Sequence, residues 1–526
     1  MKNEKFYIST AIAYSSGKPH VGNVYEIVMA DVIARYKKLC GYDVYFQTGA
    51  DEHGIKIENN AKLENKSPQE YVDEISGQIK EIWDGLNVDY NKFIRTTNEK
   101  HKIQVKKIFK KLYDQGDIYK SNYEGWYCVP CESFFTDTQL NEGKCPDCGR
   151  EVKLEKEEAY FFKLSKYQDF LIDLYNKESS LIEPVSRKNE MMKNFILDGV
   201  QDLCVSRTTF DWGVRVDFDP KHVVYVWIDA LSNYITFLGY DVDGNHSEEF
   251  KKYWPCDVHL IGKDILRFHS IYWPVLLKAL DLELPHKIFA HPWFMMNFDK
   301  MSKSKGNLIY SDDLIKFFGV DAVRYYLISE MPYLNDGNIS YELCIEKINS
   351  DLANTLGNLV NRTIAMQNKY FDGIICAYNE KEEIDNELIE MVISLKIKVE
   401  ENINNYKVGA ALSNIIDVFR RCNKYIDETT PWILAKDPEK QKRLGTVLYN
   451  LLESIRISTV LLYPFMPETS KNIFKQLNTE KTNFESINTF GGLNVGDKVG
   501  EGNILFERID ANKKMDEINK YLNEKI

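Results

Sequence analysis

The stretch Phe6-Tyr-Ile-Ser-Thr-Ala-Ile-Ala13 is apolar and rich in residues that favour β-strands. A continuous run of this kind is typical of a strand buried on both faces of a parallel sheet. A break follows at Ser15-Ser-Gly-Lys-Pro19, then His20-Val-Gly-Asn23, and a helical period runs from Val24 to Tyr36 until Gly41 stops it. The sequence therefore predicts a strand, a tight turn and a helix. In nucleotide-binding folds this arrangement turns amide groups and a helix dipole toward a phosphate.

Three residues of this turn have chemistry that suits a phosphate. Gly22 lets a nucleotide approach the backbone, and His20 can donate a hydrogen bond to a phosphate oxygen. Asn23 can also donate, although it cannot carry positive charge. A single histidine in a turn is more often solvated than catalytic, so a purely connecting turn is the alternative.

A second polar loop lies far downstream, at Lys300-Met-Ser-Lys-Ser304, continued by Lys305-Gly-Asn307. Unpaired lysines are not buried in packed cores, and the Gly-Asn pair marks a turn. Compact ammonium groups on such a loop suit an anion that gains charge, such as a triphosphate losing pyrophosphate. The alternative is a solvated basic turn. Ser311 is expected to cap the helix that follows.

These two segments resemble the signatures of one family. Residues 300–304 are identical to the KMSKS loop of class I aminoacyl-tRNA synthetases, and residues 20–23 are similar to the HIGH motif of that family, with Asn23 in place of the final histidine. The resemblance implies a Rossmann-like catalytic domain that activates an amino acid with ATP and its bound Mg²⁺. The implied catalytic residues are His20, Asn23, Lys300 and Lys303. The implied ATP-binding residues are His20, Gly22, Asn23, Asp264, His291 and Lys303.

The first half of this catalytic domain is predicted at 1–116. Asp43-Val-Tyr-Phe-Gln-Thr48 is a second strand, and it leads into Gly49-Ala-Asp-Glu-His-Gly54, charged residues at the edge where open α/β sheets bind ligands. Ser67-Pro-Gln-Glu70 is a capping box that starts a helix. His101–Lys111 is a basic amphipathic helix, whose lysines we interpret as a solvated face rather than an RNA contact.

An insertion is predicted at 117–221, with two Cys-x-x-Cys pairs at its centre. Cys128 and Cys131 are followed after thirteen residues by Cys145 and Cys148. This spacing is typical of a structural zinc site with four thiolates, and four protein sulfurs close the coordination sphere. One Zn²⁺ per chain is therefore expected, with four unrelated buried cysteines as the alternative. About a hundred residues are too few for the editing domain that the isoleucine, valine and leucine enzymes carry.

The second half of the catalytic domain is predicted at 222–350. Trp227, Ala230 and Tyr234 follow one another at about one helical turn, which by default indicates core packing. Residues 227–234 and 262–269 are, however, similar to the methionine pocket of the methionine-specific members of the family. Aromatic rings hold an unbranched thioether well. The resemblance implies Asp51 as partner of the methionine ammonium and Asp264 as partner of the ATP ribose. The implied methionine-binding residues are Ile12, Tyr14, Asp51, Trp227, Ala230, Tyr234, Ile265, Phe268 and His269.

From about Leu352 the pattern becomes helical, and an all-α anticodon-binding domain is predicted at 351–526, ending in an amphipathic helix. Asn358 and Arg362 lie four residues apart on one helix face, and Trp432 offers a plate on which an unstacked base can stack. These three residues resemble the family's anticodon readers. A surface polar pair and a packed tryptophan are the alternatives.

Length and charge fit this organisation. The chain has 526 residues and a net charge of −12, so a tRNA partner must be met by local basic faces rather than by a global field. No signal peptide or transmembrane segment is recognised, and a cytoplasmic enzyme without membrane contact is expected. The dimerising module that some relatives carry after the last helix is not seen, so we expect a monomer. The implied substrates are L-methionine and tRNA(Met), including the initiator tRNA.

Two other functions stay open on the sequence. The first is a class I enzyme for cysteine, leucine, isoleucine or valine. The insertion is too short for an editing domain, which argues against the leucine, isoleucine and valine enzymes. A zinc site closed by four thiolates argues against the cysteine enzyme. The second is a non-catalytic RNA-binding relative with a zinc knuckle. The intact 300–304 loop and Asp51 argue against it.

Overall fold

The apolar run at the start of the chain forms the centre of a parallel sheet in the computed structural model. The structure describes residues 4–129, 133–135, 137–146, 149–178, 180–296, 299–300 and 308–525. The chain divides into two units, which we describe separately. The first unit consists of Met1–Pro19, Asp43–Asp84 and Asp89–His291, and the second of His20–Tyr42, Gly85–Val88 and Pro292–Ile526.

The main sheet of the first unit has seven strands: six follow the order β2-β3-β1-β12-β13-β8, and β4 also pairs with β3. All of its pairings are parallel, as the apolar sequence of β1 predicts. Register is fixed at the centre by Tyr7 opposite Tyr45 and Ile8 opposite Val258. The strands are β1 Lys5–Thr10, β2 Ala13–Tyr14, β3 Asp43–Asp51, β4 Lys92–Arg95, β8 Ile182–Glu183, β12 Val258–Gly262 and β13 Ile288–His291.

A large apolar core packs the helices of the first unit against this sheet, with Trp273 and Tyr175 among its fully buried rings. Ser67 and Glu70 form the predicted capping box at the start of α3: the Ser67 amide donates to the Glu70 carboxylate at 2.9 Å, and the Glu70 amide donates to Ser67 Oγ at 3.3 Å. The helices are α2 Ile55–Leu63, α3 Pro68–Gly85, α4 Glu99–Asp114, α5 Gln168–Lys177, α6 Val185–Met191, α7 Val226–Thr236, α8 Glu248–Tyr253 and α9 Trp273–Ala279.

The predicted insertion forms a second, antiparallel sheet in the order β6-β5-β7-β9. It also contributes β8, which joins the main sheet beside β13. A short antiparallel pair, β10 with β11, precedes α7. The predicted boundaries at 116, 221 and 350 stay predictions. The strands are β5 Ile118–Cys128, β6 Ser133–Phe135, β7 Lys153–Phe162, β9 Leu203–Cys204, β10 Ser206–Arg207 and β11 Val223–Val224.

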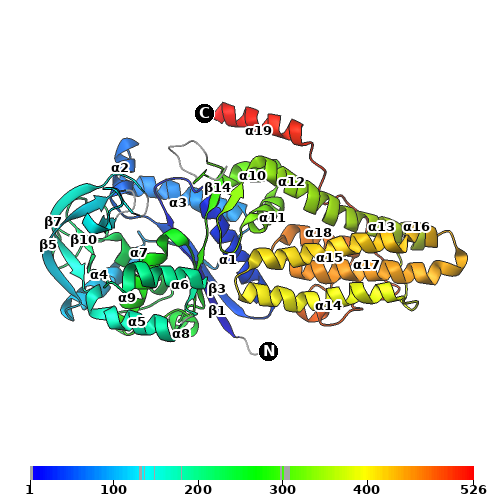
Figure 1. Cartoon of the computed structure of the whole chain (residues 1–526), viewed down its shortest axis with the longest axis horizontal. Coiled ribbons are helices and arrows are strands. Elements are labelled where there is room, and N and C mark those ends of the chain that lie inside the picture. Colours follow the sequence, from blue (N-terminus) through cyan, green and yellow to red (C-terminus); the bar gives the residue numbers. More distant parts are fainter. Residues whose placement is uncertain are drawn as a thin grey trace. The chain divides into compact units, whose positions relative to one another are not determined.

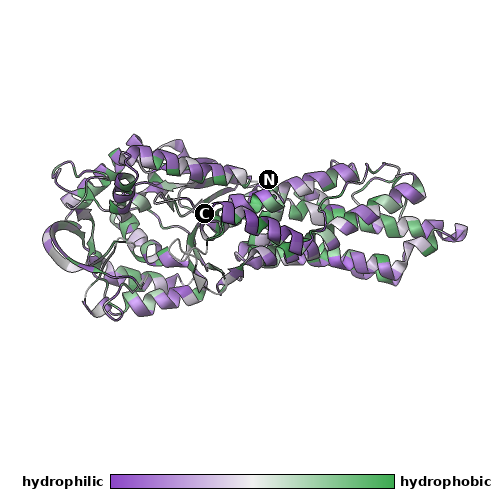
Figure 2. Cartoon of the chain, turned by 90° about the horizontal axis from the view of Figure 1, so that it is seen from above, coloured by the Kyte–Doolittle hydropathy of each residue, from purple (hydrophilic) through white to green (hydrophobic). Residues whose placement is uncertain are grey.

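The second unit is mostly helical. Helices α14, α15 and α17 run side by side (Figure 1), and hydrophobic and hydrophilic faces alternate around the helices of this unit in Figure 2. Helix α17 differs, because every residue from Arg443 to Leu462 is buried.

The second unit also contains a three-stranded sheet in the order β15-β14-β16. The strands are β14 Phe294–Met296, β15 Asp299–Lys300 and β16 Gly337–Ile339, and the helices are α1 Val21–Leu39, α10 Ser311–Phe318, α11 Val320–Glu330, α12 Tyr341–Lys347, α13 Asn358–Phe371, α14 Glu383–Asn404, α15 Val408–Thr429, α16 Pro431–Leu434, α17 Gln441–Leu462, α18 Pro467–Leu477 and α19 Ala511–Lys525.

One buried ion pair fastens the helices of this unit. Arg324 of α11 donates to Asp31 of α1 at 2.6 Å, and both side chains are fully buried. The guanidinium also donates to the carbonyls of Leu86, Pro464 and Phe465, so each of its three nitrogens makes a hydrogen bond.

The capping role predicted for Ser311 is wrong. Tyr310 occupies the N-cap position with an extended backbone, and Ser311 is the first residue of α10. The acidic first turn of Asp312 and Asp313 supplies the favourable charge at this helix end. In the part of the chain that the structure describes, no helix combines the length and apolar character needed to cross a bilayer.

Candidate functional site

Two of the predicted methionine-binding residues, Tyr14 and Asp51, lie at the carboxyl ends of β2 and β3 in the first unit. These strands place Tyr14 opposite Asp51 in parallel register. Asp51 is the last residue of β3, and its side chain is buried. A buried carboxylate is stabilised by a positive partner, and an amino acid ammonium is one.

Helix α7 and the helical segment Phe268–Tyr272 supply the aromatic wall. The rings of Trp227 and Phe268 stack with centroids 3.5 Å apart and planes 7° apart. Ala230 belongs to a small apolar cluster against which Ile12 packs. The indole N–H of Trp227 is buried with no hydrogen-bond acceptor among the described residues. The predicted aromatic residues therefore do come together, and they leave one polar donor available for a ligand.

The same two helical segments also supply Tyr234 and His269, a hydrogen-bonded pair of rings that completes the aromatic wall. His269 Nδ1 lies 3.0 Å from the carbonyl oxygen of Ile265, which can only accept, so this nitrogen carries the proton. Burial lowers the pKa of His269 to about 4, and the ring is neutral at pH 7. Its Nε2 then accepts from the Tyr234 hydroxyl at 2.8 Å. The wall is aromatic and uncharged, which suits a thioether.

The predicted nucleotide residues of the first unit lie at two neighbouring strand ends. Gly262 ends β12 and pairs in register with His291, which ends β13. His291 is buried, whereas Asp264 is exposed just after β12. Carboxyl ends of parallel strands are where open α/β sheets bind ligands.

The predicted phosphate turn lies in the second unit, where His20 is the N-cap of α1. His20 Nδ1 accepts from the Gly22 amide at 3.1 Å, so a neutral ring carries its proton on Nε2, where it can be donated. Asn23 Oδ1 accepts from the His20 amide at 3.3 Å and completes a capping box. The departure from the family motif therefore has a structural role, because Asn23 fixes the backbone of His20.

The signature loop is only partly described. The backbone of Lys300 pairs in β15 opposite Met295 of β14. Residues 301–307, and with them Lys303, lie outside the described residues.

Two of the four predicted zinc ligands lie in the described part of the chain. Cys128 and Cys145 are both buried and share one small cluster with Phe135. The Gly149 amide donates to the Cys145 carbonyl at 2.8 Å. Cys131 and Cys148 lie outside the described residues. Two buried thiols brought together from separate Cys-x-x-Cys pairs fit a thiolate-bound zinc.

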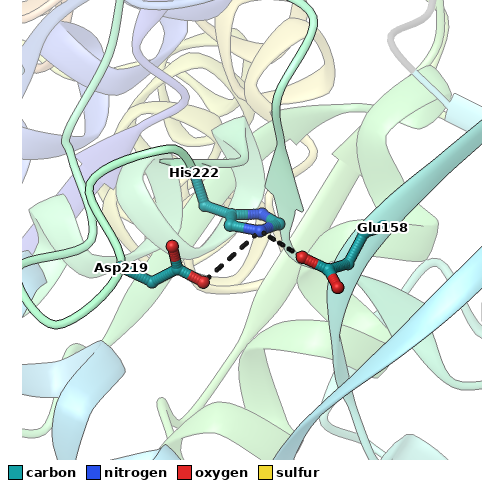
Figure 3. A group of neighbouring side chains, drawn as sticks. All are labelled: Glu158, Asp219 and His222. Carbon is teal, nitrogen blue, oxygen red and sulfur yellow. Dashed lines mark ion pairs between the residues drawn. The ribbon is translucent and has the colours of Figure 1, made fainter.

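A different group of potential metal ligands combines Glu158 of β7 with Asp219 and His222, which lie between β10 and β11. His222 Nε2 faces Glu158 Oε1 at 3.5 Å and Asp219 Oδ2 at 3.6 Å (Figure 3), while its Nδ1 lies 3.0 Å from Ser206 Oγ. The ammonium of Lys120, however, already lies 2.6 Å and 2.7 Å from the same two carboxylate oxygens. A divalent cation would have to displace it. As folded, the cluster is an ion-pair network that sequence reasoning did not predict.

The predicted anticodon residues of the second unit are accessible. Asn358 is exposed on the first turn of α13, and Arg362 lies one turn later, 3.5 Å from Asp427. Trp432 on α16 is 41% exposed, which argues against the alternative of a packed tryptophan. The lysines of α4, by contrast, are largely paired with carboxylates such as Asp217 and Asp243, as a solvated face predicts.

Most of the chain matches two known family profiles. The family profile described as "tRNA synthetases class I (M)" matches residues 6–155 and 149–364. The chain belongs to the class I methionyl-tRNA synthetases. A second profile, "Anticodon binding domain of methionyl tRNA ligase", matches residues 376–525. The chain is thus a methionine–tRNA ligase with a Rossmann-like α/β catalytic domain followed by a helical anticodon-binding domain.

Individual relatives agree with this assignment. The methionine–tRNA ligase of Clostridium acetobutylicum is 56% identical over 525 residues, covering 100% of this chain and 81% of that protein. That of Bacillus subtilis is 50% identical, covering 98% and 79%. A Mycobacterium tuberculosis methionyl-tRNA synthetase in complex with methionyl-adenylate superposes with a TM-score of 0.92 at 38% identity, covering 96% of this chain and 100% of that one.

Proposed function

We propose that this methionine–tRNA ligase binds its substrates on the residues that match the family motifs. Methionine's thioether lies against Trp227 and Phe268 with Tyr234 and His269 behind them, and its ammonium pairs with Asp51. The observation that carries this proposal is the combination of a buried carboxylate with an uncharged aromatic wall. The remaining contacts come from Ile12, Tyr14, Ala230 and Ile265.

ATP is bound by the groups that match the nucleotide motifs. The hydrogen bond that leaves the proton of a neutral His20 ring on Nε2, and the absence of a side chain at Gly22, support contacts to the phosphates. Asp264 pairs with the ribose, and His291 lies at the neighbouring strand end. Mg²⁺ arrives with the triphosphate as part of the substrate.

Catalysis in this scheme rests on position and charge rather than on a covalent nucleophile. The methionine carboxylate attacks the α-phosphate, and pyrophosphate leaves. His20, Asn23, Lys300 and Lys303 stabilise the charge that develops on the phosphate oxygens. The adenylate then transfers methionine to the terminal adenosine of tRNA(Met), whose anticodon is read by Asn358, Arg362 and Trp432.

Pyrophosphate exchange run with each of the twenty amino acids tests the substrate. Only methionine should support rapid exchange, and comparable exchange with another amino acid would contradict the pocket assignment.

Lys303→Ala should slow adenylation about 10²–10³-fold, the cost typical of losing one oriented donor to a developing charge. The affinity for methionine should barely change, because the lysine acts on the phosphates. Normal turnover with weakened methionine binding would show that the role is wrong.

The insertion is proposed to hold one Zn²⁺ through Cys128, Cys131, Cys145 and Cys148. The burial of Cys128 and Cys145 in one cluster supports this. Zinc bound there would supply folding energy rather than chemistry.

Metal analysis should find one zinc per chain, and Cys145→Ser should lower both zinc content and solubility. Cys204→Ser, at a buried cysteine outside the two pairs, is the matched control. A fully active preparation without zinc would contradict the proposal.

A further inference from the structure

Helix α7, which carries predicted methionine contacts, also carries a buried carboxylate that has no role in the proposed reaction. Asp229 of α7 is fully buried, between Trp227 and Ala230 in sequence. His53 Nδ1 lies 2.6 Å from one of its oxygens, and His101 Nε2 lies 2.8 Å from the other. Both histidines are themselves buried. These are hydrogen-bond distances, so each ring donates an N–H directly to the carboxylate.

The pairing keeps Asp229 charged in the interior. Burial alone would favour its neutral form, yet His53 and His101 hold the pKa of Asp229 well below its ordinary range. A buried carboxylate that accepts two such hydrogen bonds is a strong and directional tie. His101 is fixed in turn, because its Nδ1 lies 2.7 Å from Thr236 Oγ1 and its ring stacks on Phe237.

The two rings come from parts of the chain that meet the proposed methionine site. His53 follows Asp51 by two residues, just after the end of β3. His101 lies on α4 and contacts α7 twice, at Asp229 and at Thr236 in its last turn. The cluster therefore joins the helix that carries the aromatic wall to the corner that carries the ammonium partner.

The rest of that corner is fastened independently. Glu52 is buried and accepts from Arg95 at 2.6 Å, from the hydroxyl of Ser76 and from the hydroxyl of Thr97. Its backbone carbonyl accepts from the indole N–H of Trp212 at 2.5 Å. Asp51 is thus followed by two residues whose side chains are each locked by buried hydrogen bonds.

We infer that Asp229 is a positioning residue for methionine: with His53 and His101 it holds the α7 wall of Trp227 and Tyr234 at a fixed place relative to Asp51. The inference rests on the proposed function of Asp51 and this wall. Asp229 touches neither substrate nor reacting atoms in this role. A displaced wall weakens binding of the thioether and leaves the ATP contacts unchanged.

The test compares Asp229→Asn with wild type. Equilibrium dialysis with labelled methionine and no ATP should show a dissociation constant raised at least ten-fold, while the KM for ATP in pyrophosphate exchange changes less than two-fold. The asparagine keeps the shape but loses the charge and one acceptor. Ser232→Ala is the matched control, because this buried hydroxyl of α7 donates only to Ile228 of its own helix. It should bind methionine as wild type does.

A second pair of variants covers the case in which Asp229→Asn fails to fold. His101→Leu removes the donor and should raise the dissociation constant at least five-fold. His101→Gln restores an N–H near the Nε2 position and should recover most of the affinity. Methionine binding unchanged in His101→Leu or Asp229→Asn, despite a lower Tm, would reduce the cluster to a structural role and overturn the inference.

Asp51→Asn separates this inference from the function on which it rests. If Asp51→Asn binds methionine normally, the site assignment itself is wrong and the inference falls with it. If Asp51→Asn loses methionine binding while Asp229→Asn keeps it, only the positioning role of Asp229 is refuted.

Discussion

His269 shows how one side chain can set the electrostatics of a pocket. Its Nδ1–H is committed to the Ile265 carbonyl and its Nε2 to the Tyr234 hydroxyl, so both ring nitrogens are used while the ring is neutral. Protonation would turn Nε2 into a donor that faces a hydroxyl, in a site where a charge is poorly solvated. Burial therefore keeps the ring neutral, and the hydrogen bond to Ile265, which favours the protonated form, offsets only part of this effect.

This network predicts a pH dependence of stability. Burial lowers the pKa of His269 from 6.5 to about 4. Between these values the unfolded chain binds a proton that the folded chain excludes, so stability falls as the pH drops through 6.5 and the loss is complete near 4. At about 1.4 kcal/mol per pKa unit the loss is about 3 kcal/mol. Urea unfolding from pH 7 to pH 4.5 should show it.

His269→Gln is the reference for this measurement, because glutamine does not titrate. Other groups contribute equally to both proteins, so the stability of wild type relative to His269→Gln should decrease as the pH falls. Parallel pH profiles for the two proteins would mean that the pKa of His269 is the same in the folded and unfolded chain, against the hydrogen-bond scheme.

At the scale of elements, the Arg324–Asp31 pair joins α11 to α1. Because both side chains are fully buried, removing one partner leaves a charge in the interior. Arg324→Met should destabilise the protein by about 3–5 kcal/mol, although Arg35, 2.8 Å from Asp31, offsets part of the loss. Unfolding in urea measures the change.

Lys471→Ala is the control for that substitution. Lys471 pairs with Glu468 in the same unit, but both side chains are more than half exposed. Exposed pairs contribute at most about 1 kcal/mol, so this variant should unfold almost as wild type does. Equal losses for the two variants would show that burial is not what makes the Arg324 pair important.

The elements that could be predicted from sequence are those with a strong local pattern. The apolar run at 6–13 gives β1, the period from Val24 to Tyr36 gives α1, and the capping box at Ser67 starts α3. Ser311 was misassigned because cap preference is a weak local signal, and the backbone geometry of Tyr310 decided the helix start.

Contacts between distant segments were beyond the reach of pattern reasoning. The pairing of β8 with β13 depends on tertiary register and has no signature in the short segment Ile182–Glu183. Asp229, His53 and His101 are separated by up to 176 residues, and each alone reads as an ordinary polar residue. Motif residues such as Asp51 could be placed because the family fixes their position, whereas the residues that hold them in place could not.

At the scale of the whole molecule, the proposed methionine contacts and Trp432 lie in stretches that match different family profiles. If Trp432 stacks on an anticodon base, Trp432→Ala removes about 1–3 kcal/mol of binding. This corresponds to roughly 5- to 150-fold in tRNA affinity. Pyrophosphate exchange should stay near wild type, because it needs no tRNA, while aminoacylation falls. Both assays on one preparation give the answer.

Ile397→Ala provides the comparison, since it removes another exposed apolar side chain from the same helical unit. It should leave both activities intact. Loss of exchange and aminoacylation together in Trp432→Ala, with a lower Tm, would point to a packing role for the tryptophan.

The burial of α17 from Arg443 to Leu462 has a consequence for how the helical unit opens. Amide hydrogens at an exposed helix surface can exchange with solvent through small local fluctuations. Those from Arg443 to Leu462 have no solvent-facing side, because every one of these residues is covered by neighbours. We therefore expect deuterium to enter this part of α17 only when the surrounding helices separate from it. Its exchange rate should report the free energy of a large cooperative opening, and Arg443–Leu462 should be among the last residues of the unit to become labelled.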